Sequence, residues 1–398
     1  MLGIVKAKGA VLFDEHGKEY IDGISSWYTS VYGHCNDAII AKVYAQMQQL
    51  DQVVFSGFTH EPAIALSEAL ISLLPENQEK LFFSDNGSTA TEIGIKMALQ
   101  YHHNLGKKRS VLMAFEDGFH GDTFGAMSVS GLSVYNGPFE DYFIEVKRIP
   151  VPTAANLEGL LHELENTMDL DAVAGFIYEP LVQGAAAMKM HKAEHLEKIL
   201  KVIKSHGVLA IADEVMTGFG KTGRHFASDY MTEKPDIICM SKALTAGMLP
   251  MAVTSCTQNV YDAFYSDDIA KGLFHGHTYT ANPLACAAAL AGIELLKSEE
   301  IQKNIGQIIQ WHQEFDAQIK DHPKVAATRQ TGIIYALDLN IVMERYGNVR
   351  DKLFQHFMDA GVFLRPLGNT IYISAPYIIT KDQMQRIYDS IRDVLEKF

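Results

Sequence analysis

Short apolar runs alternate with amphipathic stretches through the middle of the chain. Runs with the length of buried strands occupy residues 110–115, 175–178, 208–213, 237–241 and 251–255. Between two of these runs, residues 196–205 repeat apolar positions at helical spacing. Strands that alternate with helices predict a mostly parallel sheet with right-handed crossovers. We therefore expect an α/β fold with a large domain over residues 51–300.

The two ends of the chain follow a different pattern. Residues 9–22 contain two alternating runs around a polar turn, which is typical of a hairpin. Near the other end, an amphipathic helix is expected over residues 301–320. The elements expected after it are strands at residues 332–339 and 372–374 and a helix from Lys381. These features predict a smaller α+β domain over residues 301–398, with an N-terminal segment, residues 1–50, packed against it.

Composition narrows the class of protein. Of the 398 residues, 47% are hydrophobic and 21% charged, as in ordinary globular proteins. The net charge of −14 argues against nucleic acid and anionic membranes as partners. No apolar run approaches the roughly 20 residues that span a bilayer, and the first residues lack the pattern of a signal peptide. We therefore expect a cytoplasmic protein.

Cysteine and histidine usage agrees with that expectation. The widely spaced cysteines, which form no Cys-x-x-Cys pair, are Cys35, Cys239, Cys256 and Cys286. Such spacing is typical of free thiols in a reducing compartment. The sixteen histidines include no His-Glu-x-x-His pattern, so we expect no metal site.

Asp213 and Lys242 point most directly to chemistry. Asp213 ends the apolar run at residues 208–213, and ligands of open α/β sheets bind at the carboxyl ends of strands. A buried carboxylate is costly unless it is paired, and a protonated pyridine nitrogen is a suitable partner. Lys242 follows the next run and offers an amine that can form a Schiff base. Taken singly, Asp213 could cap a turn and Lys242 could be a surface lysine. Together they favour a pyridoxal phosphate (PLP) site.

A phosphate site is expected where a helix starts at Ser88. The N–H groups and the dipole at a helix N-terminus bind phosphate, and Gly87 would allow the ligand to approach the backbone. Helix capping by Ser88 would explain the same residues without any ligand. The pattern at this position therefore permits both interpretations.

Phe119, Thr278 and Arg365 are further candidates, although each also fits an ordinary structural role. Phe119 lies on a glycine-bearing loop and could stack on a cofactor ring or pack in a core. Thr278 could donate to a phosphate, but Asn282-Pro283 explains part of its loop as a helix cap. Arg365 stands among apolar residues, which suits carboxylate recognition, or it reaches solvent from a strand edge.

Taken together, these segments resemble the class III (ω-amino) aminotransferases, which are PLP enzymes of fold-type I. The motifs that carry the resemblance are Asp-Glu-Val-Met-Thr-Gly-Phe-Gly at residues 213–220, Ser241-Lys242 and Phe119-His120-Gly121. The resemblance implies a large domain with a mostly parallel seven-stranded sheet and a smaller α+β domain built from both termini. It also implies PLP as cofactor and a homodimer with shared active sites.

Further segments are similar to one branch of this family. These segments are residues 22–28, 57–63, 96–101, 120–129, 177–184 and 365–372. Members of that branch convert 8-amino-7-oxononanoate to 7,8-diaminononanoate in biotin biosynthesis, with S-adenosylmethionine as amino donor. Two alternatives remain open at this point. One is a class III ω-aminotransferase that uses lysine or another amine donor, and the other is a PLP-binding or regulatory protein without catalysis.

The resemblance also implies roles for individual residues. Lys242 would carry the cofactor and Asp213 would pair with its pyridine nitrogen. The residues implied in cofactor binding are Gly87, Ser88, Phe119, His120, Asp213, Lys242 and, from the neighbouring subunit, Thr278. The residues implied in substrate binding are Trp27, Tyr28, Phe119, Gly276 and Arg365, with Arg365 on the carboxylate of the keto acid.

Three features depart from the family pattern. Phe119 stands where tyrosine is usual, so a phenolic hydrogen bond is absent. Lys221 replaces an arginine, while Arg224 follows shortly after. Family members also carry an earlier N-terminal segment with an aromatic residue that closes the substrate pocket. Either the start is assigned too late, or the chain is shortened, or Trp27 and Tyr28 close the pocket alone.

Overall fold

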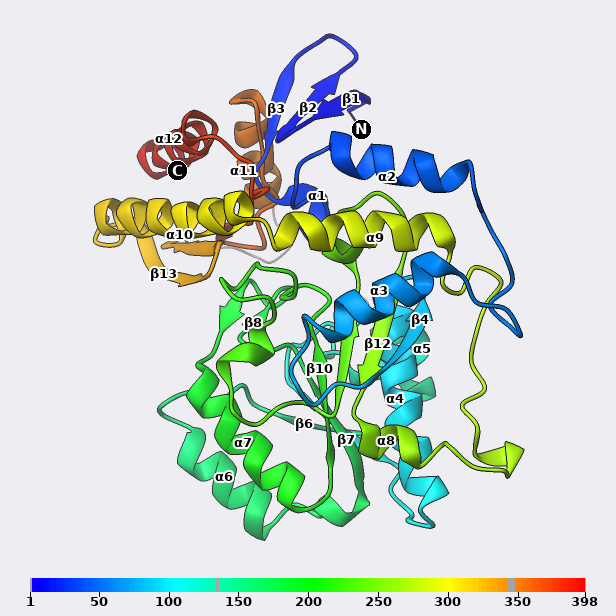
Figure 1. Cartoon of the computed structure of the whole chain (residues 1–398). Helices are drawn as coiled ribbons and strands as arrows, with labels where there is room; N and C mark the ends of the chain where they lie inside the picture. The colour runs from blue at the N-terminus through cyan, green and yellow to red at the C-terminus, as the bar shows by residue number, and fades with distance from the viewer. Residues whose placement is uncertain (1, 134–135, 342–347, 398) are drawn as a thin grey trace.

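The computed structural model describes residues 2–133, 136–341 and 348–397, and its largest sheet has seven strands (Figure 1). The order across this sheet is β4-β12-β11-β10-β7-β5-β6. The strands are β4 (Lys80–Ser84), β5 (Val111–Phe115), β6 (Val146–Ile149), β7 (Val173–Tyr178), β10 (Leu209–Asp213), β11 (Ile237–Met240) and β12 (Ala252–Cys256). β12 runs antiparallel to both neighbours, whereas the strands from β11 to β6 are parallel. The expected mostly parallel sheet is confirmed.

Alternate side chains of the central strands enter two separate cores, one on each face of the sheet. Ile211 of β10 packs in the core that contains α4 (Gly87–Asn104). Ala212 belongs to the opposite core, which contains α7 (Ala193–Ser205). Because both faces are covered, the central strands β5, β7 and β11 are apolar throughout, and this explains the continuous apolar runs in the sequence.

Segments from both ends of the chain meet in the smaller part of the molecule. The hairpin predicted over residues 9–22 is confirmed as β2 (Val11–Asp14) and β3 (Glu19–Asp22). β15 (Val362–Phe363) pairs in parallel with β3, while β1 (Ile4–Lys8) pairs with β2. The expected small region built from both termini is therefore present, and its boundaries at residues 50 and 300 stay predictions.

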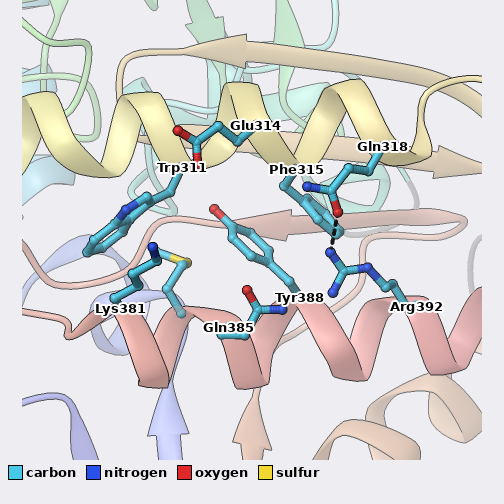
Figure 2. A pocket seen from close by; sticks show the side chains of 9 residues that line it. Trp311, Glu314, Phe315, Gln318, Lys381, Gln385, Tyr388 and Arg392 are labelled. Atoms are coloured by element: carbon cyan, nitrogen blue, oxygen red, sulfur yellow. Dashed lines mark hydrogen bonds between the residues drawn. The ribbon is translucent and has the colours of Figure 1, made fainter.

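Two long helices pack together in this smaller part. α10 (Glu299–Ile319) and α12 (Lys381–Lys397) join where Phe315 stacks on Tyr388, with ring centroids 4.1 Å apart. They line a shallow pocket in which the Arg392 guanidinium donates to the Gln318 side chain at 2.6 Å (Figure 2). An antiparallel sheet completes this part, in the order β13 (Val325–Thr331), β14 (Ile334–Leu339) and β16 (Thr370–Ile373).

The remaining elements connect these parts. The strands are β8 (Val182–Gln183) and β9 (Lys189–Met190). The α-helices are α2 (Asp37–Met47), α3 (Glu61–Ile71), α5 (Phe124–Val129), α6 (Leu157–Asn166), α8 (Gln258–Asp262), α9 (Pro283–Leu296) and α11 (Asn348–Asp359). Short 3-10 helices occupy Gly137–Tyr142, Leu170–Ala172, Ala227–Tyr230, Lys242–Thr245 and Ile269–Lys271. In the described part of the chain, no helix has both the length and the apolar content to cross a membrane.

The elements absent from the sequence prediction include β1, β6, β13, α6 and α11. β1 and β13 are edge strands, and most of β1 is exposed. An exposed edge strand has no face to bury, so its sequence shows no apolar alternation.

One short element has an unusual backbone. α1 (Ser25–Tyr28) is a single left-handed turn, in which φ is 50° at Ser25, 45° at Ser26, 67° at Trp27 and 73° at Tyr28. Left-handed backbone is unfavourable for residues that carry a Cβ, and glycine is absent from this turn. Contacts elsewhere in the molecule must therefore hold α1 in place.

Candidate active site

Asp213 and Lys242 lie at the carboxyl ends of two adjacent parallel strands. Asp213 is the last residue of β10 and pairs in register with Cys239 of β11, and Lys242 follows the end of β11 at Met240. This register brings the carboxylate and the amine to the same edge of the sheet, where α/β proteins bind ligands. The φ of Lys242 is 45°, and such strained backbone is concentrated at functional sites.

The surroundings of Lys242 favour a reactive amine. Burial lowers the pKa of this amine below its ordinary value, and the carboxylates of Asp213 and Glu179 oppose that shift. The Lys242 Nζ atom lies 5.0 Å from the centre of the Tyr28 ring. A lowered pKa leaves more of the amine neutral and therefore nucleophilic.

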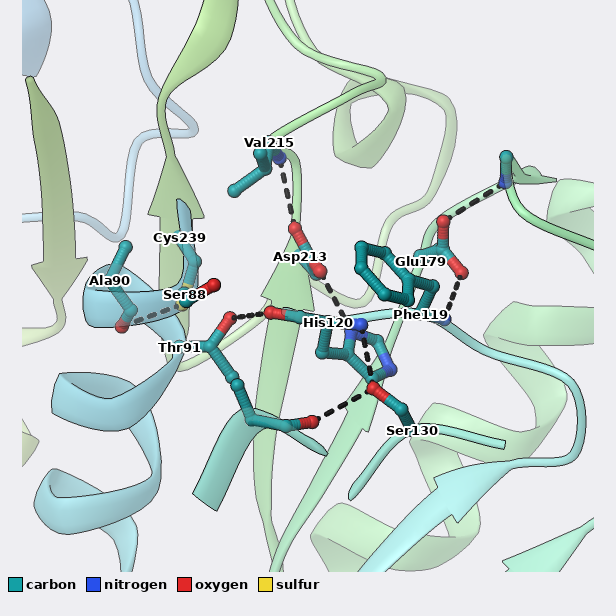
Figure 3. A network of polar contacts seen from close by, with 12 residues as sticks. Ser88, Ala90, Thr91, Phe119, His120, Ser130, Glu179, Asp213, Val215 and Cys239 are labelled. Atoms are coloured by element: carbon teal, nitrogen blue, oxygen red, sulfur yellow. Dashed lines mark hydrogen bonds and ion pairs between the residues drawn. The ribbon is translucent and has the colours of Figure 1, made fainter. Parts of the chain in front are cut away.

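Asp213 is held by a buried network of polar contacts (Figure 3). Its Oδ1 atom accepts from the Val215 N–H at 3.0 Å, and its Oδ2 atom lies 2.7 Å from His120 Nδ1. His120 is fixed in turn, since its N–H donates to Ser130 Oγ at 2.9 Å and its carbonyl accepts from Thr91 Oγ1 at 3.0 Å. The imidazole and the Val215 N–H therefore hold one carboxylate oxygen each.

Glu179 is a second buried carboxyl group at this edge. It follows β7, and its two oxygens accept from the N–H groups of Phe119 at 3.1 Å and Gly184 at 3.0 Å. Burial raises the pKa of Glu179 to about 7, with His120 opposing the shift and Asp213 adding to it. Glu179 therefore fixes the loop that carries Phe119, whose ring is partly exposed beside the site (Figure 3).

The N-terminus of α4 has unused hydrogen-bond donors. The helix is capped by Asn86, whose side chain accepts from the Thr89 N–H at 3.0 Å, so the alternative that Ser88 serves as the cap is wrong. Ser88 Oγ accepts from the Asp122 N–H at 3.2 Å, which leaves its own hydroxyl proton available. The N–H groups of Gly87 and Ser88 have no acceptor among the described residues. These donors and the helix dipole suit an anion.

Glycine allows a second loop to approach these donors closely. Gly121 has a φ of 132°, and a Cβ at this position would lie 2.2 Å from Ser88 Oγ. The loop after β5 and the start of α4 therefore form one cradle that a larger residue would fill.

Aromatic rings from α1 contact two cationic side chains. The Tyr28 ring faces Lys242, and the Trp27 ring lies 4.9 Å from the guanidinium carbon of Arg365. Tyr28 also packs near Tyr372, with ring centroids 6.1 Å apart. The structure thus brings the predicted residues Trp27, Tyr28 and Arg365 together beside Lys242.

Gly276 and Thr278 are placed differently. Both are exposed on the loop that precedes α9, and this loop forms no hydrogen bond with Asp213 or Lys242 within the described ranges of the chain. The Thr278 carbonyl accepts instead from Gln52 Nε2 at 2.7 Å. A role for either residue at the site of its own chain is therefore not supported by this geometry.

The whole chain matches a known family. The model of the aminotransferases of class III matches residues 1–395. This chain belongs to the class III aminotransferases. It is 43% identical over its full length to the adenosylmethionine-8-amino-7-oxononanoate aminotransferase of Synechococcus elongatus, of which it covers 95%. It is 37% identical to the enzyme of that name from Geobacter sulfurreducens, over 98% of this chain and 90% of the relative.

Solved structures agree with this assignment. The enzyme of the same name from Methanocaldococcus jannaschii superposes with a TM-score of 0.93 at 30% identity, over 100% of this chain and 93% of that one. A PLP-bound amine transaminase from an uncultivated Pseudomonas species gives a TM-score of 0.94 at 27% identity, over 100% and 95% of the two chains. The expected fold class and the expected PLP-dependent aminotransferase are confirmed.

The side chains of this aminotransferase fit PLP. Asp213 provides a buried carboxylate for the pyridine nitrogen, and Lys242 provides the amine for covalent attachment. Gly87 and Ser88 provide two N–H donors and a hydroxyl for the phosphate, in the cradle that Gly121 opens. The pyridine nitrogen, the aldehyde and the phosphate of the cofactor therefore each have a chemical partner at one edge of the sheet.

Lys221, which replaces the arginine usual in the family, and the nearby Arg224 lie in different surroundings. Lys221 is fully buried, and burial lowers the pKa of its amine to about 7, an effect that Lys242 increases and Glu214 opposes. Its Nζ donates to the Gly218 carbonyl at 3.3 Å. Arg224 is exposed, with its guanidinium 4.2 Å from the Tyr230 ring, so it does not take the buried position.

Sequence reasoning assigned no role to Glu179, Asp22 or His34. A signal for Glu179 was present, because it follows an apolar run at the carboxyl edge of the sheet, as Asp213 does. Asp22 accepts from the Ser26 hydroxyl in α1 and from the Ile24 N–H before it, and His34 contacts Asp22. No periodic pattern in the sequence predicts such contacts.

Proposed function

We propose that this aminotransferase moves an amino group from S-adenosylmethionine to 8-amino-7-oxononanoate, which yields 7,8-diaminononanoate for biotin biosynthesis. The observation that carries the proposal is the Trp27–Arg365 contact of 4.9 Å beside Tyr28 and Lys242. A guanidinium suits the carboxylate of the acceptor, and aromatic faces suit the sulfonium and adenosyl groups of the donor. The names of the relatives support the same pair of substrates.

Lys242 and Asp213 are the proposed catalytic residues. When bound, PLP supplies an electron sink for the negative charge that deprotonation of the donor creates. Lys242 removes the proton from the α-carbon of the donor and returns it to C4′ of the cofactor, as base and then acid. Asp213 holds a proton on the pyridine nitrogen, and His120 holds Asp213 in place.

The second substrate uses the same groups in the opposite direction. Arg365 binds the carboxylate of 8-amino-7-oxononanoate, and Lys242 delivers a proton to the carbon that receives the amino group. The donor leaves as a keto acid, with its carbonyl oxygen taken from water, before the acceptor ketone becomes an amine. Each product therefore leaves in its own half-reaction, and ping-pong kinetics follow.

A homodimer is part of the proposal. Large apolar side chains are exposed on the segment that carries Thr278, and they are Tyr265, Ile269, Phe274 and Tyr279. An exposed apolar surface of this kind favours burial against a second copy of the chain. In such a dimer Thr278 would reach the phosphate site of the partner, and Gly276 would border its substrate.

We also propose a cytoplasmic location and the domain boundaries at residues 50 and 300. Cys35, Cys239, Cys256 and Cys286 are all free thiols, which supports a reducing compartment. The change from the seven-stranded sheet to the sheets that both termini build supports the boundaries.

Steady-state kinetics with a panel of donors test the proposed reaction. With S-adenosylmethionine and 8-amino-7-oxononanoate, double-reciprocal plots should be parallel, and intersecting plots would contradict the two half-reactions. Equal or better turnover with lysine would replace S-adenosylmethionine as the donor. Loss of transfer in Lys242→Ala would dismiss a binding protein without catalysis.

A further inference from the structure

The left-handed turn α1 is held in place by a buried carboxylate. Asp22, at the end of β3, is fully buried, and its Oδ1 accepts from the Ile24 N–H at 3.2 Å. Its Oδ2 accepts from Ser26 Oγ at 2.9 Å and lies 2.8 Å from His34 Nε2. We call Asp22, Ser26 and His34 the turn clamp. One carboxylate therefore ties the start of the turn to a residue that follows it.

His34 is itself anchored to the N-terminal hairpin. Its N–H donates to the Gly9 carbonyl at 2.7 Å, and its carbonyl accepts from the Gly9 N–H at 3.0 Å. Because both backbone groups of His34 are paired, its backbone is held in the position from which the imidazole contacts Asp22. The turn clamp thus connects α1 to the hydrogen-bonded N-terminal hairpin.

The other side of the turn is tied to the active-site region. Ser25 Oγ donates to the Ser374 carbonyl at 2.7 Å, just after β16. A Cβ on Gly247 would lie 2.9 Å from the hydroxyl oxygens of both Thr29 and Ser30. Gly247 belongs to the loop that follows Lys242, so the residues directly after α1 and this loop are in close contact.

This backbone determines where two successive aromatic rings point. Trp27 lies 4.9 Å from the guanidinium carbon of Arg365, and Tyr28 lies 5.0 Å from Lys242 Nζ. The two cations come from different parts of the chain, and each is attracted by the face of a ring. A right-handed turn would direct the two side chains differently. The unfavourable backbone is therefore the feature that allows both contacts at once.

We propose that Asp22 and His34 are positioning residues that hold α1 so that Trp27 orients Arg365 and Tyr28 covers Lys242. The turn clamp would thereby set the affinity for the carboxylate of the acceptor without touching the cofactor. The expected effect on acceptor affinity rests on the function proposed above, whereas the expected effect on the mobility of the Trp27 ring does not.

The test replaces His34 and measures both the KM for the acceptor and the mobility of the Trp27 ring. His34→Leu removes the contact with Asp22, and His34→Gln keeps a side-chain donor near the same position. His16→Leu is the matched control, since His16 is exposed on the hairpin. We expect His34→Leu to raise the KM for 8-amino-7-oxononanoate at least about ten-fold, while the affinity for PLP changes less than about two-fold. His34→Gln should restore most of the KM.

Tryptophan fluorescence gives a readout that does not depend on the reaction. The chain contains two tryptophans, Trp27 and Trp311, and Trp311 lies on α10 at the pocket facing α12 (Figure 2). In a Trp311→Phe background, with PLP bound, Trp27 is the reporter. Its fluorescence anisotropy should fall in His34→Leu, recover in His34→Gln and stay unchanged in His16→Leu.

Several outcomes would overturn the proposal. If His34→Leu matches His16→Leu in both KM and anisotropy, the turn clamp does not position α1. An equal loss of PLP affinity would show a general structural role instead. Should His34→Leu fail to fold, Ser26→Ala removes a weaker part of the turn clamp and must show smaller changes in the same direction. Loss of anisotropy without any transfer from S-adenosylmethionine would retain the inference and reject the proposed substrates.

Discussion

His120 Nδ1 lies 2.7 Å from Asp213 Oδ2, and both side chains are buried. The only other hydrogen bond to this carboxylate within the described residues comes from the Val215 N–H at 3.0 Å. His120 and the Val215 N–H therefore together fix the direction of the carboxylate, and the pyridine nitrogen of PLP needs that direction to be constant. Removing a hydrogen-bond partner from a buried charged group costs more free energy than removing one from a buried neutral group.

Replacing His120 should weaken cofactor binding. We expect His120→Leu to raise the dissociation constant of PLP about ten- to a hundred-fold, because a charge-assisted hydrogen bond contributes roughly 1.5–3 kcal/mol. His120→Asn places an amide near the Nδ1 position and should recover much of the affinity. Absorbance titration of the cofactor measures both effects. Equal affinities of His120→Leu and the wild type would show that Asp213 needs no orienting group.

The close approach of Gly121 to Ser88 predicts that a larger side chain at position 121 weakens cofactor binding. In Gly121→Ala the new Cβ would lie 2.2 Å from Ser88 Oγ, so the phosphate donors must move. We expect the affinity for PLP to fall more than about ten-fold, since at least one hydrogen bond to a charged oxygen is lost. Gly106→Ala is the control, because Gly106 also has positive φ, at 73°, but has nothing within 4 Å of the new carbon. Similar PLP affinities in the two variants would exclude crowding as the cause.

The residues that supply chemistry at this site could be predicted from the sequence more completely than the contacts that hold them. Asp213 and Lys242 each follow an apolar run, and parallel strands bring their carboxyl ends together, so local pattern and sheet topology suffice. The phosphate donors at Gly87 and Ser88 follow from a helix start, although Asn86 rather than Ser88 forms the cap. The positions of these residues depend on neighbours in the sequence or on regular strand pairing, and both can be inferred from the sequence.

The left-handed turn α1 could not be predicted in the same way. Glycine and asparagine usually mark left-handed backbone, and Ser25–Tyr28 contains neither. The turn exists because Asp22, His34 and Ser374 hold it from three separate segments. Contacts of that kind follow from the complete fold, and the same holds for the exposed position of Thr278.

Lys221 should make stability depend on pH. The pKa of its amine falls to about 7 in the folded protein, from an ordinary value of 10.5 in the unfolded chain. Between these values the unfolded chain binds one more proton than the folded protein. The free energy of unfolding from this group therefore rises with pH across that window, by up to about 1.4 kcal/mol per pH unit.

Urea unfolding between pH 7 and pH 9 at a fixed PLP concentration tests this dependence. Lys221→Met removes the titrating group, so it should stabilise the protein most at the lower pH and remove the rise. Lys108→Met serves as the control, since Lys108 is exposed. A rise of equal slope in Lys221→Met and in the wild type would assign the pH dependence to another group.

Thr278 should act on the partner subunit rather than on its own. It is exposed, its carbonyl is held by Gln52 Nε2 at 2.7 Å, and its loop forms no hydrogen bond with Asp213 or Lys242 among the described residues. A dimer of Thr278→Ala should bind PLP about ten-fold more weakly, because one hydrogen bond to the phosphate is lost. Mixing Thr278→Ala with Lys242→Ala chains should then produce heterodimers with one complete site. At a PLP concentration too low to fill sites without Thr278, random pairing should give about a quarter of wild-type activity. The opposite mixture, wild type with the double variant Thr278→Ala/Lys242→Ala, should produce heterodimers in which the wild-type Lys242 lacks its phosphate donor. If the first mixture shows only the activity of its Thr278→Ala chains, and the second behaves as wild type diluted by inert chains, Thr278 serves its own subunit or none.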